Sequence, residues 1–135
     1  MRDLAGLTNL EDLSLFATQV GDRGLAHLRG LTKLKYLSLW LTNVTDGGLA
    51  EIAGLKDLET LDLQSTAITD AGLKHLEGLT KLRVLNLQYT PVSDAGLRHL
   101  RSLNSLRSLR LTDTKVSEAG VQALRKALPT LEVSR

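Results

Sequence analysis

A 24-residue unit repeats along this chain, and no other feature limits its fold so strongly. Residues 58–81 read LETLDLQSTAITDAGLKHLEGLTK, and residues 82–105 read LRVLNLQYTPVSDAGLRHLRSLNS. The same frame covers residues 10–33, 34–57 and 106–127. A fixed period of this length indicates a repeat architecture, in which each unit packs against its neighbours along the chain.

Each unit carries two hydrophobic patterns, one after the other. Leu61 and Leu63 alternate with other residues, which favours a short, half-buried strand. Leu73, Leu76 and Leu79 recur at intervals of three, which favours one face of a short helical turn. Because one unit is too thin to bury its own leucines, we expect stacked units to share a continuous core.

The units follow the pattern LxxLxLxxTxVxDxGLxxLxxL, with small departures. This pattern resembles the leucine-rich repeat family, in its 24-residue form with Thr in place of the usual Asn or Cys. The resemblance covers essentially the whole chain. It implies an α/β fold, a right-handed solenoid with a parallel concave β-sheet and short helices on the convex side. It also implies a bacterial origin and a non-catalytic role as a protein–protein interaction module, within a family that has many unrelated partners.

Three other positions of the unit predict internal contacts. The threonines should form a ladder in which each hydroxyl bonds backbone groups where the strand turns away. Residues such as Thr69 and Ser93, which precede an aspartate, are expected to cap the helical turns. A glycine recurs where we expect helix and strand to approach so closely that a Cβ would clash. The threonines are Thr18, Thr42, Thr66, Thr90 and Thr114, and the glycines are Gly24, Gly48, Gly72, Gly96 and Gly120.

The whole chain, 1–135, is predicted to be a single leucine-rich repeat domain. Residues 1–9 align with the tail of a repeat whose strand is missing, so we expect the parent protein to extend further toward its N-terminus. Residues 128–135 resemble a C-terminal cap, in which Leu131 and Val133 begin another strand. We therefore expect this chain to be the C-terminal part of a longer protein.

Composition excludes several classes of function. The 17 basic and 15 acidic residues nearly balance, which points to neither nucleic acid nor an acidic membrane as a partner. The chain has no cysteine, and its histidines are not spaced as a ligand set, so no metal and no cofactor are predicted. No apolar run approaches the roughly 20 residues of a membrane helix. No signal peptide is recognised, and the cytoplasm is slightly favoured as the location.

The expected concave surface carries all four aromatic residues of the chain, whereas the predicted core is aliphatic. Tyrosine and tryptophan are enriched at binding hot spots, and exposed apolar patches usually mark interaction sites. Tyr36 and Trp40 are predicted to anchor a protein partner, and the polar residues of the later repeats are predicted to set specificity. The predicted partner-binding residues are Phe16, Tyr36, Trp40, Leu41, Asp62, Gln64, Asn86, Gln88, Tyr89 and Arg110.

Three other functions are compatible with the same residues. Aromatic and amide side chains on an open face could bind a carbohydrate. An apolar N-terminal end could support a structural role through end-to-end self-association. The repeats could also recognise the substrate of an enzyme that is fused to this chain or bound to it in a larger assembly. No catalytic residue is predicted in this chain, because an open solenoid face does not form a water-excluding pocket.

Overall fold

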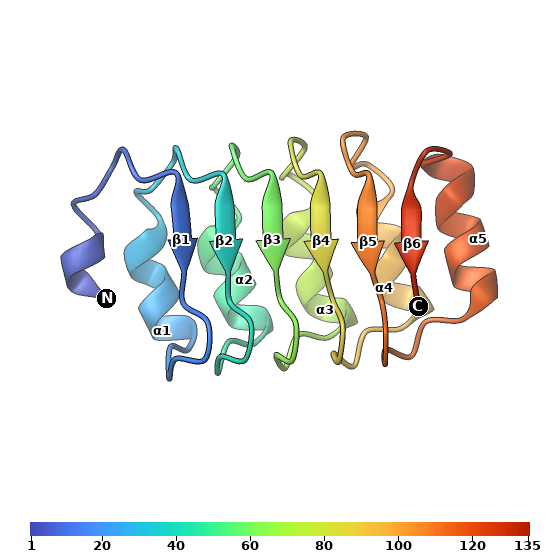
Figure 1. Cartoon of the computed structure of the whole chain (residues 1–135), viewed down its shortest axis with the longest axis horizontal. Coiled ribbons are helices and arrows are strands. Elements are labelled where there is room, and N and C mark those ends of the chain that lie inside the picture. Colours follow the sequence, from blue (N-terminus) through green and yellow to red (C-terminus); the bar gives the residue numbers. More distant parts are fainter.

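A computed structural model describes all of residues 1–135, and its strands form one six-stranded parallel sheet in sequence order. Successive strands lie side by side along the length of the molecule (Figure 1). Each residue pairs with its counterpart in the next repeat, so that Leu13 lies opposite Leu37 and Leu37 opposite Leu61. The strands are β1 Asp12–Ser14, β2 Tyr36–Ser38, β3 Thr60–Asp62, β4 Val84–Asn86, β5 Ser108–Arg110 and β6 Glu132–Ser134.

Short helices form the second layer and lie behind the sheet (Figure 1). Three of the repeats have one α-helical turn followed directly by a 3₁₀ turn, which suits leucines spaced by three because the 3₁₀-helix has three residues per turn. The α-helices are α1 Asp22–Leu25, α2 Asp46–Ile52, α3 Asp70–Leu73, α4 Asp94–Leu97 and α5 Glu118–Ala127. The 3₁₀ turns are η1 Arg2–Leu4, η2 Ala26–Leu28, η3 Lys74–Leu76 and η4 Arg98–Leu100.

The core between the two layers is one cluster of 33 buried aliphatic residues. Leu61 and Leu63 of β3 and its flank are fully buried, as are Leu73 and Leu76 on the helix side. No aromatic ring takes part in this cluster. The sheet layer and the shared core confirm the predicted leucine-rich repeat solenoid, and β6 confirms the predicted strand at Leu131 and Val133. None of the helices is long and apolar enough to cross a membrane.

The predicted threonine ladder is present in every repeat. Each threonine hydroxyl donates a hydrogen bond to the carbonyl of the leucine three residues earlier, as in Thr66 Oγ1 to Leu63 O at 2.6 Å. Thr42, Thr66 and Thr90 are buried, so these bonds satisfy hydroxyls that water does not reach. The ladder fixes the chain where it leaves the sheet, and its five bonds are 2.6–2.7 Å long.

The residues expected to cap the helices have a different main contact. Thr69 makes no side-chain cap bond to its own helix; its backbone N–H and its hydroxyl donate to Asp46 of the preceding repeat, at 2.8 and 2.5 Å. Ser93 caps weakly, through Ala95 N at 3.4 Å, and also donates twice to Asp70. The same pair of bonds recurs in four repeats, and its acceptors, here called the aspartate ladder, are Asp22, Asp46, Asp70 and Asp94.

The aspartate ladder also corrects the expected reason for the recurring glycines. A Cβ on Gly48 would lie 2.6 Å from Asp22 Oδ1 and 2.8 Å from Val44 Cγ1. A Cβ on Gly72, Gly96 or Gly120 would likewise overlap the carboxylate of the preceding repeat. At these four glycines the nearest atom belongs to the preceding repeat on the helix side, whereas a Cβ on Gly24 would meet Val20 of its own repeat at 3.1 Å. Glycine leaves room for the carboxylate that links each repeat to the next.

Candidate interaction surface

Side chains that leave the strands away from the core form one surface, here called the sheet face. It is the surface predicted to be concave. Alternation along each strand places Tyr36 and Ser38 on this face, whereas Leu37 between them is fully buried. The register then stacks equivalent residues in rows across the sheet. One row is Asp12, Tyr36, Thr60, Val84, Ser108 and Glu132, and the other is Ser14, Ser38, Asp62, Asn86, Arg110 and Ser134.

The turn after each of the strands β1 to β5 adds one residue in the left-handed conformation. Leu41 and Tyr89 both have φ of 56°, and equivalent residues of the other repeats match them. The neighbouring repeat holds this geometry, because Leu41 N donates to Gln64 O at 3.0 Å and Tyr89 N to Thr112 O at 2.9 Å. A left-handed residue with a side chain costs roughly 1–2 kcal/mol. The sequence did not reveal these turns, since none has a glycine at this position: the residues are Ala17, Leu41, Ser65, Tyr89 and Asp113.

Two aromatic rings stack where β1 and β2 end. The ring centroids of Phe16 and Trp40 are 4.4 Å apart, with the planes tilted by 36°. Phe16 remains 47% exposed, Trp40 36% and the adjacent Leu41 54%. Phe16 and Trp40 are in contact, and Leu41 follows Trp40 in the chain; these three residues are called the apolar patch below. They leave a large apolar area in water at one end of the sheet face.

The two tyrosines lie apart from this patch. Tyr36 begins β2, four residues before Trp40, so about 13 Å of strand separates them. Tyr89 follows β4 and occupies the same turn position as Leu41, two strands away. Their side chains are 37% and 50% exposed, respectively. The four aromatic residues therefore share one face without forming a single cluster, and only the Phe16–Trp40 pair is in contact.

The polar residues at the middle of the sheet face are largely engaged with one another. Asp62 Oδ1 accepts a hydrogen bond from Gln64 N at 3.0 Å, and Asn86 Oδ1 accepts one from Gln88 N at 3.0 Å. Asn86 also donates from Nδ2 to Gln64 Oε1 at 3.1 Å. These contacts hold the turns after β3 and β4. Asn86 is only 4% exposed, so of the predicted binding residues it is the one with least surface for a partner.

Arg110 on β5 is the only predicted binding residue that is basic. It is exposed, lies opposite Asn86 and Ser134 in the register, and forms no ion pair within the chain. A partner carboxylate can therefore reach it without displacing an internal contact.

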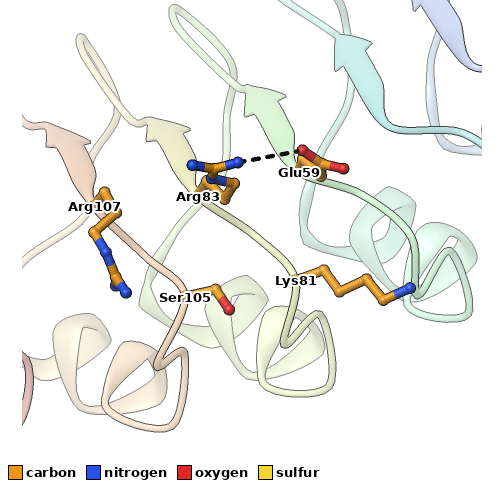
Figure 2. A pocket seen from close by; sticks show the side chains of 5 residues that line it. All are labelled: Glu59, Lys81, Arg83, Ser105 and Arg107. Atoms are coloured by element: carbon orange, nitrogen blue, oxygen red, sulfur yellow. Dashed lines mark ion pairs between the residues drawn. The ribbon is translucent and has the colours of Figure 1, made fainter.

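A second set of polar residues lies beside the sheet face, on the loops that enter the strands. There, a solvent-filled hollow of about 360 Å³ is lined only by polar side chains: Glu59, Lys81, Arg83, Ser105 and Arg107 (Figure 2). None of these five residues is among the predicted partner-binding residues. A signal was nevertheless present, since Glu11, Lys35, Glu59 and Arg83 alternate in charge at the repeat spacing.

Charge pairs between consecutive repeats shift two ionisation equilibria at this edge. A hydrogen bond from Lys35 to Glu11, together with the charge of Glu11, raises the pKa of Lys35. The Lys81 ammonium donates to Asp57 at 2.6 Å and lowers the pKa of that carboxyl group. Both shifts favour the charged forms, so Lys35 and Asp57 are ionised at neutral pH.

No group of three or more His, Cys, Asp or Glu side chains is placed to hold a metal ion. The histidines lie on the helix side, where His99 Nδ1 is 2.5 Å from Glu77 Oε1 of the preceding repeat.

Comparison with known proteins adds the family. The leucine rich repeat family model matches residues 56–116. No curated protein matches the chain. Among solved structures, internalin C2 of Listeria monocytogenes is 30% identical with a TM-score of 0.85, over 99% of this chain and 55% of that one. A leucine-rich repeat protein of Leptospira interrogans is 25% identical with a TM-score of 0.68, over 98% of this chain and 39% of that one.

Two more distant structures share the fold alone. An internalin (inlF) of Listeria monocytogenes is 20% identical with a TM-score of 0.84, over 98% of this chain and 36% of its own. The plant peptide hormone receptor RGFR1, solved in complex with RGF2, is 19% identical with a TM-score of 0.67, over 98% of this chain and 21% of its own. The chain thus spans between about a fifth and just over half of the proteins it resembles.

Proposed function

Because this chain belongs to the leucine-rich repeat family, we propose that it is a non-catalytic module that binds a protein partner on its sheet face, with the apolar patch as anchor. Proteins of this family generally mediate protein–protein interactions. They are typically non-catalytic. The single observation that carries the proposal is the exposed Phe16–Trp40 stack, with ring centroids 4.4 Å apart.

The apolar patch does not form part of the core, so stability of the fold does not explain its presence. The core contains 33 aliphatic residues and none of the patch. Leu41 is 54% exposed and occupies a left-handed turn position, where a bulky residue is unfavourable. A side chain that is strained, apolar and exposed is better explained by contact with a partner than by stability.

A protein partner fits the sheet face better than a carbohydrate does. Sugar binding requires free hydrogen-bonding groups beside the aromatic ring, but Asp62, Gln64 and Asn86 already bond to one another or to nearby backbone. The stacked rings instead offer an apolar anchor of the kind that is typical of binding hot spots. A glycan array with a specific hit that requires Trp40 would reverse this preference.

The test is a paired capture followed by measured affinities. Wild-type chain and the Trp40→Ala variant are used as baits in lysate of the source organism, with Lys74→Ala, an exposed change on η3, as matched control. We expect one protein to be captured by wild type and by Lys74→Ala and lost by Trp40→Ala. With that protein purified, Trp40→Ala should weaken Kd by roughly 30-fold, as for a hot-spot residue of about 2 kcal/mol. Equal affinity of the three chains would reject the apolar patch as the anchor.

End-to-end association remains a separate prediction, and one observation favours it. Leu7 is 48% exposed and Leu4, Leu10 and Leu13 are only half-buried, whereas the leucines at the same positions of the next repeat are fully buried. A second copy of the chain could cover this end. Molar mass that stays monomeric across a wide concentration range would rule it out for this chain.

A further inference from the structure

The polar hollow of Figure 2 lies where a regular pattern of ion pairs is interrupted. Two residues of each repeat face their counterparts in the next repeat along the edge where the strands begin. Lys33 donates to Asn9 at 2.7 Å and Lys35 to Glu11 at 2.9 Å. Lys81 donates to Asp57 at 2.6 Å, and Arg83 lies 4.0 Å from Glu59. We call these residues the edge ladder: Asn9 and Glu11, Lys33 and Lys35, Asp57 and Glu59, Lys81 and Arg83, and Ser105 and Arg107.

Lys35 and Arg83 occupy equivalent positions in this ladder but have different neighbours. Lys35 lies between two acidic residues, Glu11 on one side and Glu59 on the other, and both carboxylates raise its pKa. Arg83 has Glu59 on one side only. On its other side the alternation predicts an acid, but the chain has Arg107. Repeat five thus places a cation where a carboxylate would complete the pattern.

The two arginines are immediate neighbours. Arg107 N donates to Arg83 O at 2.8 Å, so the two residues lie side by side just before the adjacent strands β5 and β4. Like charges at adjacent positions are unfavourable unless an anion lies between them. Figure 2 shows the head of Arg83 turned toward Glu59, while Arg107 extends toward the loop that carries Ser105. Arg107 bonds only backbone oxygens, of Asn104 at 2.8 Å and Leu106 at 3.1 Å, and has no carboxylate partner.

We propose that the hollow between Arg83 and Arg107 binds a carboxylate group, supplied by an acidic side chain of a protein partner. The guanidinium groups would donate to the carboxylate oxygens, and the Ser105 hydroxyl and the Lys81 ammonium line the same hollow. One carboxylate matches the charge of the site, because Glu59 and Asp57 already offset part of its three cations. Those two acids disfavour a doubly charged phosphate.

The claim that the carboxylate comes from a protein rests on the proposed protein-binding function. The claim that the hollow binds a carboxylate does not rest on it. The probe is a fluorescein-labelled peptide of six consecutive glutamates, with a peptide of six glutamines as its neutral counterpart. Fluorescence polarisation at low salt gives Kd for the wild-type chain and for Arg83→Gln and Arg107→Gln. The matched control is Lys35→Gln, which removes one positive charge from the equivalent position of the edge ladder. Lys35 differs from the two arginines in lying between two acidic residues.

We expect each arginine substitution to weaken glutamate-peptide binding roughly fivefold, as for an exposed ion pair, and Lys35→Gln to change it less than about twofold. Backbone amide shifts in NMR spectra should move most at Arg83, Ser105 and Arg107. Equal weakening by Lys35→Gln, or equal binding of the glutamine peptide, would overturn the site. Displacement of the peptide by inorganic phosphate at lower concentration than by acetate would overturn the carboxylate assignment.

The apolar patch provides the check that separates the two proposals. Trp40→Ala should leave binding of the glutamate peptide unchanged, since Trp40 lies at the opposite end of its strand from the edge ladder. Loss of the captured partner by Trp40→Ala with intact peptide binding supports both sites. Intact capture by that variant, combined with weakened peptide binding by Arg107→Gln, supports the carboxylate site and rejects the patch.

Discussion

The helix side and the sheet face of this molecule repeat to different degrees. On the helix side, the same two hydrogen bonds to an aspartate of the preceding repeat occur four times, with lengths that differ by no more than 0.1 Å. On the sheet face, the equivalent row changes at nearly every step: Phe16, Trp40, Gln64, Gln88 and Thr112. Positions that form hydrogen bonds to the next repeat keep the same residue type. Positions that face water vary, and their side chains are free to contact a partner.

The comparison predicts opposite consequences of substitution on the two sides. On the helix side, a change should reduce stability because two repeats depend on each contact. On the sheet face, a change in the apolar patch should reduce binding and leave stability nearly unaltered. Asp62 and Asn86 are intermediate, since they lie on the sheet face but hold the turns after their own strands.

The largest effect is expected from Gly48→Ala. The added methyl would lie 2.6 Å from Asp22 Oδ1, 2.8 Å from Val44 Cγ1 and 3.1 Å from Leu25 Cδ1. Two of these neighbours are fully buried and cannot move freely. We expect a loss of about 2–3 kcal/mol in the free energy of unfolding, measured with urea, as for an overpacked site. Gly54→Ala is the control, because its Cβ would meet nothing within 4 Å. Its effect should stay within about 0.5 kcal/mol, and equal losses would refute the assigned role of the aspartate ladder.

A change of sign is expected at Gly120. The three atoms nearest to its added Cβ all belong to the Asp94 side chain. In the wild-type background, Gly120→Ala should therefore destabilise, by about 1–2 kcal/mol. An Asp94→Ala background removes these three atoms, so alanine within helix α5 should stabilise by up to about 1 kcal/mol relative to glycine. A double-mutant cycle measures this coupling. Additive effects of the two substitutions would show that the glycine does not make room for the carboxylate.

The sequence predicted the parts of the fold that depend on hydrophobic period and failed where a side chain acts across repeats. The spacing of Leu61, Leu63 and Leu73 was sufficient to predict strand, helical turn and shared core. Thr69 has the residue type and the position of a helix cap. Its hydrogen-bond partner, however, is Asp46, which lies 23 residues earlier and is close only after the repeats stack. Local patterns do not encode such contacts.

The candidate surface shows the same limit. Alternation placed Phe16 and Trp40 on one face, and the repeat period made them neighbours. It could not show that Asn86 is buried or that its side chain bonds to Gln64 and to the backbone of Gln88. It also could not show the left-handed turn at Leu41, because a ladder of backbone bonds from the next repeat imposes that geometry without a glycine.

A smaller effect tests the sheet face at Leu41. Its φ of 56° is costly for leucine and for alanine but not for glycine. Leu41→Gly should therefore be more stable than Leu41→Ala, by about 1 kcal/mol, although both remove the same exposed side chain. Thermal unfolding of the two variants measures the difference. Both should weaken partner binding equally. A glycine variant less stable than the alanine variant would mean that the turn is not strained, and would weaken the argument that Leu41 is present for binding.

The smallest effect concerns the ionisation of the last aspartate in the ladder. The Ser117 hydroxyl and backbone N–H donate to Asp94 at 2.5 and 2.7 Å, and with a smaller contribution from the Arg135 charge they lower the pKa of Asp94 in the folded state. Because the folded state prefers the carboxylate, this contribution to stability is complete above the ordinary pKa of about 3.9 and is lost as the pH falls through the lowered value. NMR titration should show that Ser117→Ala raises the pKa of Asp94 and flattens the acid limb of the stability curve. Ser117→Thr should preserve both, since threonine makes the same contact at Thr45 and Thr69. If Ser117→Ala leaves the pKa of Asp94 unchanged, the hydroxyl does not stabilise the carboxylate, and the ladder would depend on its backbone bonds alone.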